Sequence, residues 1–153
     1  MTLQKEEEQK KQKKVYNIKF SVNSLCPCGN GNKYKKCCQP FHKGKLPKTA
    51  LELMKSRYSA FALSNGKYII HTTHTNNPDY TIDTTKWLQD IQNFVTSCEF
   101  KNLEVIEFTS LENEAFVTFK ATIFCNKEDC SFTEKSRFIK ENNKWFYISG
   151  VFL

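Results

Sequence analysis

Residues 26–38 read CPCGNGNKYKKCC. Structural zinc is held by four soft ligands in a tetrahedron, and a turn usually brings two pairs of them together. Cys26 and Cys28 form the first pair, and Cys37 and Cys38 form the second. Four cysteines within thirteen residues are hard to explain as unrelated thiols. We therefore predict that these thiolates bind one structural zinc ion per chain.

The fourth ligand is the open question in this motif, because the adjacent residues Cys37 and Cys38 must both reach the same ion. His42 follows Cys38 by four residues and is the alternative donor. We favour Cys38. Neither set of ligands leaves an open coordination position, so the predicted zinc is structural and not a Lewis acid.

Basic side chains are concentrated in the first third of the chain. Residues 1–51 carry twelve lysines and three glutamates, and no acidic residue occurs over 9–51. Three interpretations remain open: a solvated tail, an anionic partner such as RNA or an acidic protein surface, or compensation of the negative charge of a zinc ion with four thiolates. Lys33, Lys35 and Lys36 lie inside the cysteine loop and are the candidate contacts for an anionic partner.

The length and composition are those of a globular protein in a reducing compartment. The chain has 153 residues, and no run approaches the ~18 apolar residues of a membrane span. The first 14 residues lack the apolar stretch of a secretory signal, so we predict a cytoplasmic protein. In that compartment we expect Cys98 to be a buried small hydrophobe, and Cys125 and Cys130 to be free thiols that pair only if oxidised.

Periodicity divides the chain into a charged arm over 1–20 that we expect to be disordered, a zinc knuckle over 21–46 and a folded domain over 47–153. Helical spacing follows Thr49, which forms a capping box with Glu52. After residue 99 the period changes to two, which is typical of strands. The sequence predicts an α+β domain with three helices on a curved antiparallel sheet. The expected helices cover 49–65, 67–73 and 85–97, and the expected strands cover 101–109, 114–125, 131–141 and 144–152.

The cysteine motif resembles the SEC-C motif, a small zinc module found in the motor of the protein-export machinery. Together with residues 39–41 (QPF), 49–61 (TALELMKSRYSAF) and 145–147 (WFY), it resembles the YchJ-like family. The resemblance covers residues 24–153. It implies a cone-shaped nuclear transport factor 2-like (NTF2-like) domain behind the zinc knuckle, and it implies a partner at the ribosome or the export machinery.

A second site follows from the expected pairing of the last three strands. A four-residue loop between Cys125 and Cys130 would pair Phe119 with Ser136, and a two-residue turn at 142–143 would pair Ser136 with Ser149. Polar groups then lie on the apolar, inward face, where they need partners. The predicted pocket residues are Arg57, Tyr58, His74, Trp87, Glu134, Ser136, Tyr147 and Ser149.

Two interpretations of this pocket remain: a structural hydrogen-bond cluster, or an acid–base site built on Glu134 and His74. We favour the structural one and a non-enzymatic role. The predicted function is a zinc-binding cytosolic adaptor at the ribosome or the protein-export machinery. The alternatives are a pocket enzyme or small-molecule sensor that uses the α+β domain, and RNA binding through residues 1–48.

Overall fold

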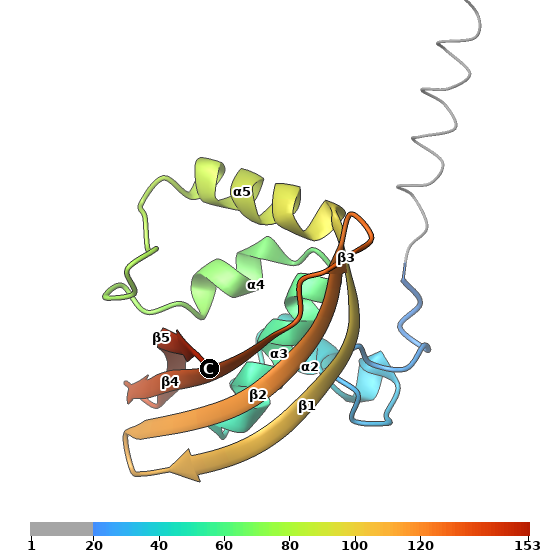
Figure 1. The fold of residues 1–153 in the computed structure, drawn as a ribbon. Helices are drawn as coiled ribbons and strands as arrows, with labels where there is room; N and C mark the ends of the chain where they lie inside the picture. The colour runs from blue at the N-terminus through green and yellow to red at the C-terminus, as the bar shows by residue number, and fades with distance from the viewer. Residues whose placement is uncertain (1–19) are drawn as a thin grey trace, which may run out of the picture.

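The computed structural model describes residues 20–153. The predicted charged arm therefore lies outside the described residues, except for Phe20 at its end. A cysteine module over residues 20–48 precedes an α+β domain, which begins with the helix cap at Thr49 (Figure 1). In the module the helices are η1 (Tyr34–Lys36) and α2 (Gln39–His42). In the domain the elements are α3 (Ala50–Ala62), α4 (Gly66–His71), α5 (Thr84–Thr96), β1 (Cys98–Ser110), β2 (Glu114–Cys125), β3 (Glu128–Asp129), β4 (Phe132–Glu141) and β5 (Lys144–Phe152).

Helix α3 begins at the predicted capping box. The Thr49 hydroxyl accepts a hydrogen bond from the Glu52 amide at 3.1 Å, and the Glu52 carboxylate accepts one from the Lys48 amide at 2.9 Å. These bonds satisfy amide groups that a helix start otherwise leaves unpaired. The side chains of Leu53 and Met54 then pack into the main core. Helix α3 therefore lies along the concave face of the sheet (Figure 1).

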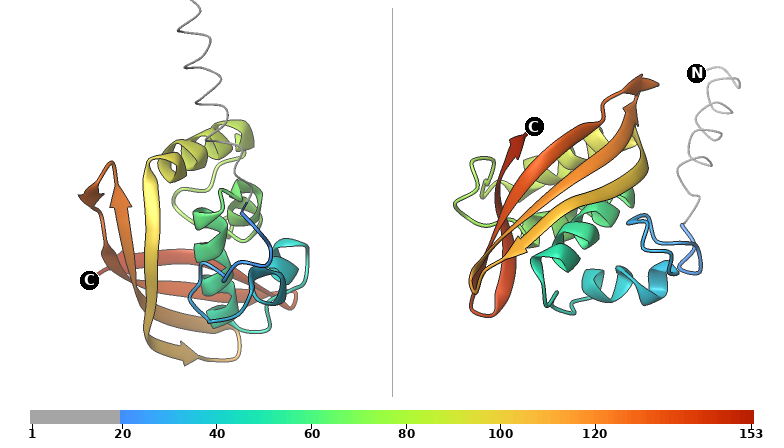
Figure 2. Two further views of the ribbon diagram at one scale, coloured as in Figure 1. Left: turned by 90° about the vertical axis from the view of Figure 1, so that its right-hand side faces the viewer. Right: turned by 60° about the horizontal axis from the view of Figure 1, so that its bottom comes forward.

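The sheet is antiparallel and strongly curved. Its strand order is β1-β2-β4-β5, and the short strand β3 pairs with the end of β2. Helices α4 and α5 lie over the part of the concave face next to α3, and the cysteine module lies beside α3 outside the sheet (Figure 2). The core between α3 and the sheet is centred on Leu53, Val117 and Phe138, which are almost fully buried. The predicted α+β architecture, with three helices on a curved antiparallel sheet, is confirmed.

The register between β2 and β4 differs from the predicted one by two residues. Phe119 pairs with Glu134, not with Ser136. The cause is the turn: Asn126 and Lys127 have φ of 52° and 65° and form a two-residue connection between Cys125 and Glu128. Positive φ at both central positions is the mark of a type I′ hairpin turn. Because strand side chains alternate with period two, the inward face is unchanged.

Strand β5 contains a bulge that the sequence did not predict. The pairing runs from Glu141↔Lys144 to Phe138↔Tyr147 and then shifts by one residue, so that Arg137 pairs with Ser149 and Ser136 pairs with Gly150. An odd shift reverses the side-chain faces beyond it. The predicted placement of Ser149 in the pocket is therefore wrong, because Ser149 shares the outward face of Arg137.

The cysteines of the sheet also pair differently from the prediction. Cys98 and Cys125 are directly opposite in the β1–β2 register, with their Cα atoms 4.0 Å apart, and form a disulfide. Neither residue is a free thiol, and Cys130 is exposed and unpaired. Pairing Cys125 with Cys130 would require the four-residue loop, which the turn at Asn126 and Lys127 replaces.

None of the helices described for residues 20–153 combines the length and the apolar character needed to cross a membrane.

Candidate functional site

The first cysteine pair lies on a tight turn. The Cys26 amide donates to the Asn32 carbonyl at 2.8 Å, and the Gly29 amide donates to the Cys26 carbonyl at 3.1 Å. Gly29 and Gly31 have φ of 78° and 85°, a backbone region that side chains with a Cβ rarely adopt. The glycines therefore let the chain reverse beside the two sulfurs.

The second pair lies where one short helix ends and another begins. Cys37 follows η1 as its C-cap, and its amide donates to the Tyr34 carbonyl at 3.0 Å. Cys38 is the N-cap of α2. The backbone changes direction between the two residues, with φ −123° and ψ −97° at Cys37. This break lets adjacent side chains reach one centre.

The four sulfurs form a group that can hold a metal ion. The Sγ atoms of Cys26, Cys28, Cys37 and Cys38 all lie within 4.8 Å of one another. Tetrahedral zinc with bonds of about 2.3 Å separates its sulfurs by about 3.8 Å, and the Cys28 and Cys37 sulfurs are 3.5 Å apart. The donor set and its spacing thus fit a single tetrahedral ion.

Burial of the cluster makes four thiolates costly without a cation. Hydrogen bonds from Cys28 and Cys38 lower the pKa of the Cys26 thiol. Burial and the neighbouring Cys28 sulfur raise the pKa of Cys37 to about 12, and hydrogen bonding to Cys26 and Cys28 raises the pKa of Cys38. The Cys26 thiol therefore ionises readily, and its negative charge disfavours ionisation of the neighbouring thiols. A divalent cation supplies the charge that allows all four to bind as thiolates.

His42 is engaged elsewhere. Its Nε2 lies 2.8 Å from the Ser56 carbonyl oxygen, which can only accept, so Nε2 carries the proton and donates. Nδ1 is then the acceptor for the Tyr34 hydroxyl at 2.6 Å. Burial lowers the pKa of His42, which favours this neutral form. Both ring nitrogens are used, so the structure brings Cys38 and not His42 to the sulfur cluster.

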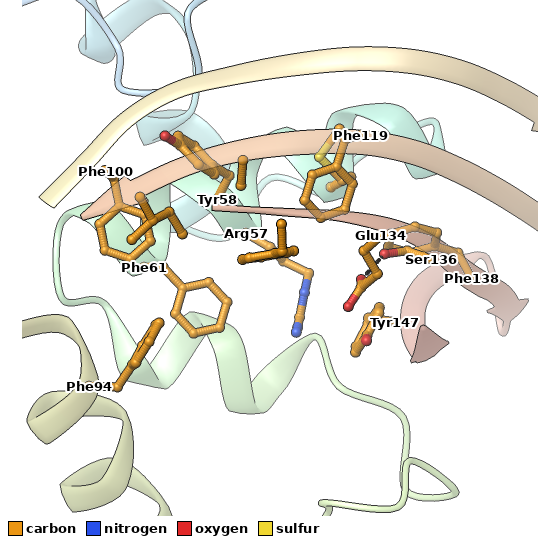
Figure 3. A pocket seen from close by; sticks show the side chains of 14 residues that line it. Arg57, Tyr58, Phe61, Phe94, Phe100, Phe119, Glu134, Ser136, Phe138 and Tyr147 are labelled. Carbon is orange, nitrogen blue, oxygen red and sulfur yellow. Dashed lines mark hydrogen bonds between the residues drawn. The ribbon is translucent and has the colours of Figure 1, made fainter. Parts of the chain in front are cut away.

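The predicted pocket residues divide into two groups. A cavity of about 200 Å³ lies between α3 and the concave face of the sheet, and its lining includes Arg57, Tyr58, Glu134, Ser136 and Tyr147. Figure 3 shows the guanidinium of Arg57, the carboxylate of Glu134 and the ring of Tyr147 gathered at one end. The structure thus brings five of the eight predicted residues together.

His74, Trp87 and Ser149 lie outside this lining. The His74 amide donates to the Tyr147 carbonyl, and its Nε2 lies 3.0 Å from the Glu141 carboxylate. Trp87 on α5 packs against Tyr80. The acid–base alternative built on Glu134 and His74, which we did not favour from the sequence, is excluded because His74 lies against β5 and pairs with Glu141.

The sequence reasoning missed the aromatic part of the pocket. Phe61 and Phe94 come from the helices, while Phe100 and Phe119 come from the sheet, and all four line the cavity. The period-two pattern does mark Phe119 as inward. Only the tertiary structure shows that Phe119 and the other three phenylalanines border a cavity and do not pack into a filled core.

Tyr58 contributes a buried ring and hydroxyl to the pocket. Its ring lines the cavity and packs edge-on against Phe100 with the centroids 5.7 Å apart. Its hydroxyl is buried and has no hydrogen-bond partner among residues 20–153. Burial, and secondarily the charge of Cys28 when it is ionised, raise the pKa of Tyr58 to about 12, so the hydroxyl stays protonated at neutral pH.

Comparison with known proteins gives one consistent family. The sequence model described as "YchJ, middle NTF2-like domain" matches residues 49–150. A UPF0225 protein of Photorhabdus laumondii is 36% identical over 135 residues, which cover 85% of this chain and 82% of that protein. Two solved SEC-C motif proteins are each 27% identical with TM-scores of 0.71. The one from Rhodopseudomonas palustris is covered to 98% and the one from Psychrobacter arcticus to 82%, with 84% of this chain aligned to each.

Proposed function

We propose that this chain, which belongs to the YchJ-like family, is a zinc-binding adaptor. Its cysteine module would present lysines to an anionic partner at the ribosome. Four cysteine sulfurs around one centre, three of them on buried residues, are the donor set that zinc prefers. A closed site of this kind stabilises a fold and does not catalyse. The module is too small for a core of its own, so the metal stabilises its folded form.

The observation that carries the proposal is the charge of the module surface. Between residues 20 and 51 there is no Asp or Glu. The module has six lysines, and all of them are exposed. A zinc ion with four thiolates carries a charge of about −2, so this lysine surface remains strongly positive after the metal is counted. The lysine surface consists of Lys33, Lys35, Lys36, Lys43, Lys45 and Lys48.

The lysine surface is held on a rigid support. The His42 ring joins the module to α3 through Ser56, and the Trp145 indole donates to the Lys48 carbonyl at 3.2 Å. Trp145 is itself in the main core. A fixed array of cations binds an anionic surface with less loss of conformational entropy than a mobile tail. The geometry therefore supports recognition by the module itself.

Co-sedimentation of the full zinc-loaded chain with ribosomes over a series of salt concentrations tests this proposal. Replacement of Lys33, Lys35 and Lys36 by Glu should weaken binding and flatten its salt dependence. Each lost phosphate contact removes about 0.7–0.9 from the slope of log K against log salt. The matched control variant replaces three exposed lysines outside the module by Glu: Lys86 on α5, Lys120 on β2 and Lys127 in the β2–β3 turn.

The zinc content of each variant must be measured alongside, because the loop lysines also face the charge of the metal site. Weaker binding in the loop variant, with full zinc and an unchanged control variant, supports the adaptor. Absence of salt-sensitive co-sedimentation, or an unaltered slope in the loop variant, would refute the proposal.

A further inference from the structure

The polar end of the interior pocket holds two opposite charges that do not neutralise each other directly. Arg57 is buried, and its Nη1 donates to the Ile69 carbonyl and to the hydroxyls of Thr72 and Thr73. Glu134 accepts a hydrogen bond from Ser136. No ion pair joins Arg57 to Glu134 among the pairs found in residues 20–153. Both groups face the cavity (Figure 3).

The guanidinium has donors left over. A guanidinium offers five N–H groups, and the hydrogen bonds of Arg57 to residues 20–153 all start from Nη1. Among residues 20–153, the Tyr58 hydroxyl is the only side-chain polar atom that is both fully buried and without a hydrogen-bond partner, so the other nitrogens of Arg57 are not fully enclosed. They therefore have access to the pocket. The guanidinium lies over the ring of Tyr147, with Cζ 4.6 Å from the centroid, and this cation–π contact helps to hold it in place.

The carboxylate is also placed by its surroundings. A Cβ atom at Gly150 would lie 2.5 Å from Cδ of Glu134, closer than real Cβ contacts allow. The β5 bulge places this glycine opposite Ser136. The absence of a side chain at Gly150 therefore leaves room for the carboxylate to lie at the polar end of the pocket.

The rest of the lining is aromatic and aliphatic, and it sets the size of the occupant. An apolar cavity of about 150 Å³ binds benzene. The cavity here is about 200 Å³, which leaves room for one ring and a short polar group. Phe94 lies on the lining and is 44% exposed, so this side of the pocket reaches solvent. Aromatic walls favour a flat apolar body with edge-to-face contacts.

We propose that this pocket binds a small, net-neutral aromatic molecule whose head offers a hydrogen-bond acceptor to Arg57 and a donor to Glu134, as a carboxamide or an α-amino acid does. An anionic head would be repelled by Glu134, and a cationic head would be repelled by Arg57. A head without polar atoms would leave the buried Arg57 guanidinium and the half-buried Glu134 carboxylate without a partner that replaces water. Only a head that carries both a hydrogen-bond acceptor and a donor satisfies Arg57 and Glu134 together.

Four probes that share one ring and differ in the head test the proposal: benzamide, benzoate, benzylamine and toluene. Ligand-observed NMR titration of the full zinc-loaded chain measures the Kd of each. Benzamide should bind at least about tenfold more tightly than any of the other three, since hydrogen bonds to charged groups are the strong ones. Tightest binding of benzoate, benzylamine or toluene, or no saturable binding of benzamide up to about 10 mM, would overturn the proposal.

Two substitutions of the same kind separate the pocket from general effects. Glu134→Gln keeps the size of the side chain and removes the negative charge, so the preference for benzamide over benzoate should fall by about tenfold. Glu141→Gln is the control, because Glu141 lies on the same strand and pairs with His74 outside the pocket. An unchanged preference in Glu134→Gln, or an equal change in Glu141→Gln, contradicts the assignment.

Gly150→Ala supplies an independent test that leaves both charges in the sequence. Its new methyl group should push the Glu134 carboxylate away from Ser136 and weaken benzamide binding several-fold. The carboxylate is the flexible end of a side chain, so the fold should persist, and dispersed amide NMR signals verify this. Unchanged benzamide affinity in folded Gly150→Ala would show that the carboxylate position does not matter, which overturns the proposal.

Discussion

Replacement of His42 by Ala distinguishes an anchoring imidazole from a metal ligand. In the structure the imidazole connects the Tyr34 hydroxyl to the Ser56 carbonyl, and it packs against the tilted ring of Tyr68 with the ring centroids 4.7 Å apart. We expect His42→Ala to retain one zinc ion per chain and to lower the free energy of unfolding. Cys38→Ser should lose most of the zinc, because it removes one of the four sulfurs at the centre.

The magnitude follows from the groups that the substitution leaves behind. Tyr34 is buried, with 9% of its surface exposed, so its hydroxyl would lose its partner in a nearly closed site. An unsatisfied buried polar group costs about 1–3 kcal/mol, and the lost bond to the Ser56 carbonyl adds about 1 kcal/mol. We therefore expect His42→Ala to destabilise by about 2–4 kcal/mol. Tyr34→Phe removes only the hydroxyl and should cost about 1 kcal/mol.

Urea unfolding of the zinc-loaded proteins measures these free energies, and elemental analysis of the same samples measures the metal. A double-mutant cycle over Tyr34 and His42 isolates their coupling, which should be about 1 kcal/mol or more. If His42→Ala loses the zinc while Cys38→Ser keeps it, the ligand assignment is wrong. If His42→Ala keeps both the zinc and the full stability, the anchoring role is wrong.

Three further outcomes follow from the structure. Removal of the metal by a chelator should abolish amide-exchange protection over residues 20–48 and leave the sheet protected, because the α+β domain has its own core; loss of protection throughout would contradict this. Under oxidising conditions Cys98→Ser should lower the free energy of unfolding by about 3–4 kcal/mol, the value for a cross-link that closes a loop of this length, and the difference should vanish in reductant. Burial lowers the pKa of His42 below 6.5 in the folded chain, so the unfolded chain takes up the proton first as the pH falls. The stabilisation that neutral His42 contributes is therefore complete above about pH 6.5 and is lost as the pH falls through the folded pKa. In urea titrations the wild type and His42→Ala should converge in stability at acid pH.

The sequence predicted the fold where local chemistry decides the structure. Thr49 and Glu52 start α3 through short-range bonds, and the residues 142–143 form the expected turn, with φ of 50° and 62°. The turn at Asn126 and Lys127 has the same conformation but was missed, since lysine is an unusual residue for positive φ. Its effect on register was two residues, an even number, so the prediction that Glu134 faces inward remained correct.

The errors in the pocket come from interactions between distant segments. The bulge in β5 shifts the register by one residue, which turns Ser149 outward. The residues that precede it in the strand carry no sequence signal for a bulge. Gly150 gave the one available signal, since glycine inside a strand often marks a bulge or a close approach. His74 was misplaced because its position depends on a bridge between Thr73 and Tyr147, which no local pattern specifies.

Four consecutive residues of α3 connect the two sites. The Ser56 carbonyl accepts from His42, and the Ser59 hydroxyl lies 3.9 Å from the Cys26 sulfur. Between them, Arg57 and Tyr58 line the pocket. Consecutive residues on a helix point about 100° apart, so one turn of α3 serves the module on one side and the cavity on the other. Ser56 and Ser59 are fully buried although they are polar, because each of their hydroxyls bonds to a backbone carbonyl one turn earlier. Small polar residues at these positions let the module approach the helix closely, and larger side chains there would push the cysteine cluster away from the domain. The segment SRYS at 56–59 therefore serves the helix, the metal module and the pocket together, which the amphipathic pattern of α3 alone does not reveal.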